Sequence, residues 1–121
     1  MSEEMKKLFS YEDRLVRFAG ECIFFSRKLN ADFELQYYRN QLIRSSGSSA
    51  LNYGEAQGTV TSKDFIHKTS VVVKELKESR STLKILNYIN EGESQKRDWL
   101  LEEAEELIAI GSKMIFNKIK N

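Results

Sequence analysis

Residues 62–88 read SKDFIHKTSVVVKELKESRSTLKILNY. Within this stretch, apolar and small residues recur at alternating intervals of four and three, at Phe65, Thr69, Val72, Leu76, Ser79, Leu83 and Leu86. That spacing places these side chains on one face of an α-helix. Because such a face must be buried against other helices, the stretch predicts a helical bundle, although it discloses no reaction.

Three other segments show the same spacing. The first of them comprises Tyr11, Leu15, Phe18, Cys22, Phe25 and Leu29. The predicted helices cover residues 11–29, 33–53, 62–89 and 95–119. The chain contains no proline, the strongest helix breaker. Four helices joined by short connections favour an all-α fold, an antiparallel up-down-up-down four-helix bundle, in one domain that spans residues 1–121.

Local signals mark the ends of these helices. Ser10 with Asp13, and Thr61 with Asp64, have the spacing of N-terminal caps. Ser94 is the expected cap of the last helix. Three connections are expected. They lie at residues 30–32, Asn-Ala-Asp, between the glycines at positions 54 and 58, and at residues 90–92, Asn-Glu-Gly.

Composition restricts the classes of function. Of the 121 residues, 40% are apolar, as in ordinary globular proteins. The single cysteine, Cys22, has no partner for a disulfide or for a zinc site of the usual spacing. The N-terminal residues are charged and lead into no apolar run of signal-peptide or transmembrane length. We therefore expect a cytoplasmic protein that does not associate with a membrane.

Charge is distributed unevenly, although the net charge is only +1. Residues 36–90 contain eight basic and four acidic side chains, whereas residues 91–106 contain two basic and seven acidic ones. The acids therefore begin the last helix and lysines end it, which is the order that the helix dipole favours.

The sequence contains one candidate metal-ligand motif and one candidate nucleophile. Asp64 and His67 have the acid-x-x-His spacing of di-metal sites in helical bundles, but such a site uses two of these motifs and the chain has one histidine. We therefore expect His67 to be a surface residue and predict no metal or other cofactor. Cys22 lies in a row of leucine and phenylalanine, which favours buried packing over catalysis.

Two polar clusters also have a structural interpretation. The serines within residues 45–49 lack both a glycine-rich phosphate loop and a nearby base, so close helix packing is the favoured interpretation. The glutamates at positions 102, 103, 105 and 106 indicate a solvated acidic face rather than paired catalytic carboxylates. No catalytic residue is predicted, and we expect a protein that is not an enzyme.

A second stripe follows the helix of residues 62–89, offset from its apolar row. It comprises Lys63, His67, Ser70, Lys74, Lys77, Ser81, Lys84 and Tyr88, and contains no acid. From its first to its last lysine it spans roughly 30 Å, enough to follow several phosphates of a nucleic acid. An ordinary solvated face is the alternative interpretation.

The candidate nucleic-acid-binding residues are therefore Lys63, Lys74, Lys77 and Lys84, with Arg39 and Arg44 as secondary candidates. For the two arginines the alternative is a structural role, through pairing with acids and, for Arg44, support of the second helix.

Three segments carry a family resemblance. These are QLIRSSGSSALNYGEAQG at residues 41–58, SKDFIHK at 62–68 and KELKES at 74–79, with Arg44–Glu55 the most specific part. The chain resembles the bacterial four-helix-bundle family of proteins encoded within intervening sequences of large-subunit ribosomal RNA. That family is related to the accessory variability proteins of diversity-generating retroelements.

The resemblance implies a homo-oligomer, a homopentameric ring or barrel, whose small residues on the second helix make tight contacts. It also implies RNA or DNA as a partner and, for retroelement relatives, a reverse transcriptase; it transfers no catalytic residue. Two hypotheses follow. The first is a non-catalytic oligomer that binds RNA or another nucleic acid through the basic stripe. The second is a protein scaffold or adaptor, anchored by an exposed Trp99 or Tyr88, with no nucleic-acid role.

Overall fold

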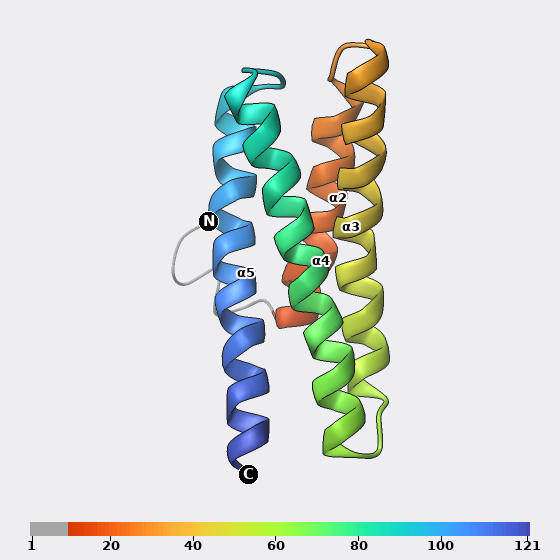
Figure 1. Ribbon diagram of the computed structural model, residues 1–121, viewed down its shortest axis with the longest axis vertical. Helices are drawn as coiled ribbons and strands as arrows, with labels where there is room; N and C mark the ends of the chain where they lie inside the picture. Colours follow the sequence, from red (N-terminus) through yellow and green to blue (C-terminus); the bar gives the residue numbers. More distant parts are fainter. Residues whose placement is uncertain (1–9) are drawn as a thin grey trace.

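Four antiparallel helices lie side by side in the computed structural model, which describes residues 10–121. They are α2 (Tyr11–Arg27), α3 (Phe33–Gln57), α4 (Ser62–Tyr88) and α5 (Ser94–Lys120). Each helix packs against the next one in the chain, and α2 also packs against α5, which closes the bundle. The predicted all-α, up-down-up-down architecture is confirmed. Because α2 is the shortest helix, α3, α4 and α5 extend beyond its first residue (Figure 1).

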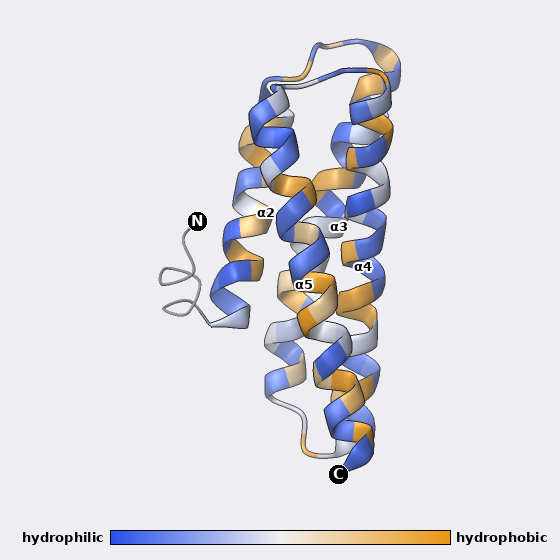
Figure 2. Cartoon of the chain, turned by 90° about the vertical axis from the view of Figure 1, so that its left-hand side faces the viewer, coloured by the Kyte–Doolittle hydropathy of each residue, from blue (hydrophilic) through white to orange (hydrophobic). Residues whose placement is uncertain are grey.

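The core is built from the rows that the helical spacing predicted. Hydrophobic and hydrophilic residues alternate along each helix, as burial of one side requires (Figure 2). Phe18 of α2, Leu42 of α3, Leu76 of α4 and Leu100 of α5 are completely buried. Burial of one such side chain contributes about 1.5–3 kcal/mol to folding, so these rows hold the helices together.

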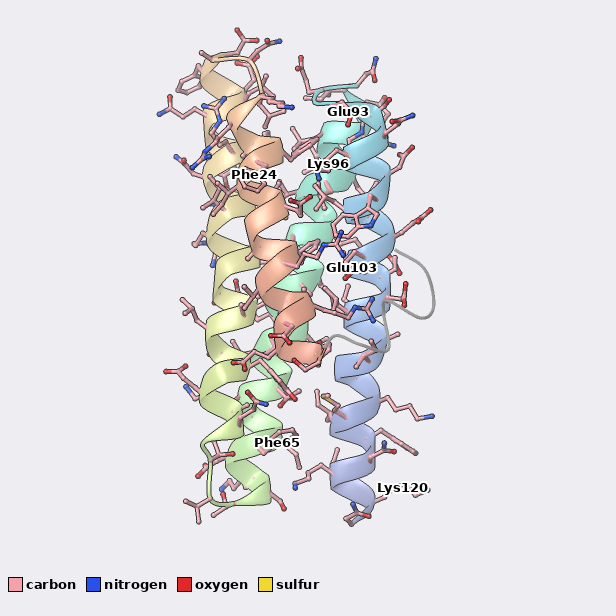
Figure 3. The ribbon with its side chains drawn as sticks, turned by 180° about the vertical axis from the view of Figure 1, so that it is seen from behind. Phe24, Phe65, Glu93, Lys96, Glu103 and Lys120 are labelled. Carbon is pink, nitrogen blue, oxygen red and sulfur yellow. The ribbon has the colours of Figure 1, made fainter. Side chains whose placement is uncertain are left out.

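Side-chain caps begin three of the helices. The Ser10 hydroxyl accepts a hydrogen bond from the Asp13 amide at 3.0 Å, and the Thr61 hydroxyl accepts one from the Asp64 amide at 3.1 Å, as predicted. The prediction of Ser94 as the last cap was wrong. The carboxylate of Glu93 occupies that position and accepts hydrogen bonds from two backbone amides of the first turn of α5, at 3.2 and 2.7 Å. A carboxylate there also complements the helix dipole. Figure 3 shows Glu93 at the start of α5.

Helix α3 continues beyond its predicted end at residue 53. Gly54 lies within the helix, and Gly58 is its C-terminal cap. Tyr53 and Ala56 are both buried, so the last turn of α3 contributes to the core and offsets the low helix propensity of Gly54. The connection to α4 is therefore shorter than the sequence suggested.

The turn between α4 and α5 requires a glycine. Asn90 and Gly92 have positive φ angles of 56° and 87°. A Cβ atom on Gly92 would lie 2.3 Å from the Phe25 ring, so both the backbone conformation and the close approach of α2 exclude a side chain. The Arg97 guanidinium fixes the turn by donating hydrogen bonds to the Glu91 carbonyl at 2.6 Å and to the Asn87 side chain at 3.0 Å.

One ion pair is buried between α2 and α5. The guanidinium of Arg14 donates to both carboxylate oxygens of Glu103, at 2.8 and 3.2 Å, and the two residues are only 5% and 3% exposed. The expectation that the glutamates of α5 form a solvated face is therefore wrong for Glu103. Glu106 also lies 3.3 Å from Arg14, and Glu105 pairs with Arg80 at 3.0 Å.

None of the helices among residues 10–121 is long and apolar enough to cross a membrane.

Candidate nucleic-acid interface

The basic stripe of α4 faces solvent along its whole length. Its residues, namely Lys63, His67, Ser70, Lys74, Lys77, Ser81, Lys84 and Tyr88, are all exposed. The opposite face of α4 contributes Val72, Leu76 and Leu83 to the core. Burial of that face therefore orients the stripe outward, because the two rows are offset around one helix.

The four lysines of the stripe have no partner among residues 10–121. Most other cations in this part of the chain have one. Five of them form ion pairs, namely Arg14, Arg44, Lys68, Arg80 and Lys96. Two form hydrogen bonds, Arg39 and Arg97. Four lie over aromatic rings, namely Arg17, Arg27, Lys118 and Lys120. Of the described cations without such a contact, only Lys28 and Lys113 lie outside the stripe.

A shallow groove of about 660 Å³ adjoins the stripe. On the α4 side its lining includes Ser70, Lys74, Lys77 and Ser81 of the stripe, together with Ile85. The α3 side contributes Tyr37, Tyr38 and Gln41. The Tyr37 and Tyr38 rings pack edge to face, with centroids 5.1 Å apart. This surface therefore combines free cations with an exposed aromatic ring.

Sequence reasoning missed the contribution of α3 to this groove. Tyr37 and Ile85 lie on different helices and come together only through the antiparallel pairing of α3 with α4. The sequence does contain a sign that Tyr37 is exposed. Tyr37 is adjacent to the apolar row of Leu35, Tyr38 and Leu42 but does not share its helical spacing. A large aromatic residue at such a position remains partly exposed, and Tyr37 is 58% exposed.

The two secondary candidates, Arg39 and Arg44, have structural contacts. Arg39 donates to the backbone carbonyls of Ser26, Leu29 and Asn30 at 3.0, 2.8 and 3.0 Å, and so ties α3 to the end of α2. Arg44 pairs with Glu75 at 3.0 Å and with Glu78, and these contacts link α3 to α4. We leave both arginines out of the proposed interface, because their donors are already engaged.

The serine cluster of α3 packs against its neighbours. Ser45, Ser46 and Ser49 are buried, and the Ser45 hydroxyl lies 2.7 Å from that of Ser79 on α4. Gly47 differs, because no atom lies within 4 Å of the position of a Cβ atom on it. The predicted close packing therefore holds for the three inward-facing serines, while Gly47 faces outward.

Cys22 and His67 lie where the sequence predicted. Cys22 is completely buried, and its removal from water raises the pKa of its thiol to about 12. A hydrogen bond with Ser46 lowers this pKa by a smaller amount. A thiol with so high a pKa is a poor nucleophile at neutral pH. His67 is exposed on the stripe. Among residues 10–121, no three histidine, cysteine or acidic side chains are grouped closely enough to hold a metal ion.

The two aromatic residues considered as anchors for a protein partner differ in exposure. Tyr88, at the end of α4, is 91% exposed. Trp99 is half-buried, and its ring is covered by Arg17 and Lys96, whose charged groups lie 5.0 and 5.7 Å from its centroid.

Comparisons with known proteins agree with this architecture. One solved structure is that of a protein with unknown function from the S23 ribosomal protein family of Bacteroides thetaiotaomicron VPI-5482. It is 21% identical, and the alignment covers 88% of this chain and 98% of that one with a TM-score of 0.81, which shows the shared fold. Comparison with curated proteins gives no match. The model of the family described as 23S rRNA-intervening sequence protein matches residues 11–113. The chain therefore belongs to the 23S rRNA-intervening sequence protein family.

Proposed function

We propose that this protein is a non-catalytic, oligomeric helical bundle that binds RNA or another nucleic acid through the basic stripe of α4. The observation that carries the proposal is the concentration of free cations. Lys63, Lys74, Lys77 and Lys84 share one exposed helix face and have no acidic partner among the described residues.

Free lysines suit contact with phosphates for an electrostatic reason. A lysine already paired with a carboxylate must give up that contact before it binds a phosphate, whereas an unpaired one releases only counterions. Four such contacts, spread over roughly 30 Å of one helix, follow the backbone of a nucleic acid rather than a single phosphate group.

An oligomer would repeat the stripe and so strengthen a weak contact. The family resemblance leads us to propose a homopentamer. The outer face of α3 supports self-association, because Leu51 is 73% exposed and lines a surface groove of about 650 Å³ with Ile43 and Gly47. A second helix could approach closely there, because Gly47 carries no side chain. Linked subunits then bind one nucleic acid with an avidity greater than that of each single site.

Charge reversal tests the nucleic-acid proposal. We expect Lys74→Glu/Lys77→Glu to abolish binding of a structured RNA in a fluorescence anisotropy titration at low salt. The matched control is Lys28→Glu/Lys113→Glu, which reverses the two free lysines outside the stripe and should retain most of the affinity. The proposal fails if the wild-type protein does not bind at low salt, or if both variants lose affinity equally.

Tyr88 favours a second candidate function, a protein scaffold or adaptor without a nucleic-acid role. An aromatic side chain exposed to this extent is a typical anchor at protein interfaces. Capture of the tagged protein from its native cells, with and without nuclease, separates the two functions. A direct protein partner survives the digestion and disappears with Tyr88→Ala, whereas a partner tethered by RNA is lost with the nuclease alone.

A further inference from the structure

Tyr37 brings an uncovered aromatic ring to the groove beside the basic stripe. Several other aromatic side chains on the surface are covered by a cation, as Phe24 is by Arg27 and Phe116 by Lys120. No cation lies over Tyr37 among residues 10–121, and its contact with Tyr38 holds the ring at the edge of the groove. Its surface is therefore available to a ligand.

The rest of the groove provides charge and hydrogen-bonding groups. Lys74 and Lys77 line it and carry no counter-ion from the described residues. Its one acidic residue, Glu78, is paired with Arg44, which reduces the repulsion that a bound phosphate would meet. Between Ser70 and Ile85 the groove follows about 22 Å of α4, long enough for several nucleotides.

We propose that this groove binds an unpaired strand of nucleic acid, with a base stacked on Tyr37 and the adjoining phosphates on Lys74 and Lys77. The proposal rests on the proposed function and specifies the form of nucleic acid that the stripe takes. In a duplex the faces of the bases are stacked on one another, so only the phosphate contacts remain available. An unpaired strand offers both contacts, because every base has a free π-face.

The preference for an unpaired strand is tested by anisotropy titrations at one salt concentration. The probes are a strand of about 12 nucleotides, within the site sizes of single-strand binders, and a hairpin duplex containing the same sequence. Each is made as RNA and as DNA. Tighter binding of the strand than of the hairpin supports the proposal, and the difference between RNA and DNA identifies which sugar the groove prefers.

Tyr37→Ala tests the role of the aromatic ring. It should weaken binding of the strand by about 5- to 150-fold, the range for loss of one stacked base, and leave binding of the hairpin unchanged. Tyr37→Phe keeps the ring and should retain the affinity. Phe33→Ala is the matched control, because Phe33 is on the same helix, is 90% exposed and lies outside the groove.

The outcomes separate this inference from the proposed function. If Lys74→Glu/Lys77→Glu abolishes binding of both probes while Tyr37→Ala changes neither, the nucleic-acid function stands and the stacking groove is refuted. Equal weakening of both probes by Tyr37→Ala also refutes it. If the wild-type protein binds neither probe, both proposals are overturned.

Discussion

Removal of either partner of the buried Arg14–Glu103 pair should destabilise the bundle strongly, whereas replacement of both should not. The guanidinium and carboxylate meet through two hydrogen bonds of 2.8 and 3.2 Å in a nearly dry contact between α2 and α5. Loss of one partner leaves a buried charge without compensation, at a cost of about 3–5 kcal/mol. The net stability of a domain is only about 5–15 kcal/mol, so this loss is a large fraction of it.

The two single variants should differ in the size of the loss. In Glu103→Leu, Arg14 keeps an ion pair with the more exposed Glu106 at 3.3 Å, so the free energy of unfolding should fall by only about 3 kcal/mol. In Arg14→Met, Glu103 loses the cation that binds both of its oxygens, and the loss should approach about 5 kcal/mol. In the double variant Arg14→Met/Glu103→Leu, two apolar side chains pack in the same space, and stability should return to within about 1 kcal/mol of the wild type or exceed it.

Chemical denaturation followed by circular dichroism measures the free energies of unfolding of the wild type and the three variants. All four are compared at one protein concentration, because the proposed self-association would make stability depend on concentration. In thermal scans each 1 kcal/mol corresponds to about 4 °C in Tm for a chain of this size. The reasoning is refuted if either single variant unfolds within 1 kcal/mol of the wild type, since that result would mean that water reaches the pair and screens it.

Three further predictions concern the turn, the cysteine and the outer face of α3. Gly92→Ala should destabilise the protein by about 1–3 kcal/mol, because residue 92 has a positive φ and its new methyl group would collide with the Phe25 ring. Gly20→Ala, at an open position within α2, should instead stabilise the protein by about 0.5–1 kcal/mol. Denaturation curves of the two variants that shift in the same direction would contradict this. Burial raises the pKa of the Cys22 thiol to about 12, so this thiol should react with a disulfide reagent at neutral pH only as fast as the protein unfolds. Rapid labelling of the native protein would contradict this, because it would show that the reagent reaches Cys22 in the folded bundle. If the proposed oligomer forms through the outer face of α3, Leu51→Glu should convert it into monomers in light scattering. Val60→Glu, at another exposed apolar side chain in the connection between α3 and α4, should not. A Leu51→Glu protein with unchanged mass would exclude this face from the interface.

The sequence was sufficient for the helices, their faces and the basic stripe because each of these depends on local spacing. Leu76 and Leu83 of α4 are buried because they share one side of a helix, and Lys74 and Lys84 are exposed because they lie on another. Such relations can be read from positions three and four residues apart, without knowledge of any other segment.

Features that depend on contacts between distant segments could not be predicted in this way. Glu103 is buried because Arg14, 89 residues away in the chain, lies opposite it. The guanidinium of Arg39 is engaged because α2 ends beside α3, where it donates to three backbone carbonyl groups. Gly54 remains helical because its neighbour Tyr53 packs into the core, which overrides the weak propensity of glycine.

The salt dependence of affinity tests the central claim, that lysines of α4 contact phosphates, most directly. The measurement compares the wild-type protein with Lys74→Gln/Lys77→Gln/Lys84→Gln, which removes three charges without adding repulsion. On a plot of log K against log salt concentration, each phosphate contact contributes a slope of about −0.7 to −0.9. Our account predicts that the variant binds a structured RNA more weakly and that its slope is shallower by about 2–3. Equal slopes for the two proteins would contradict it.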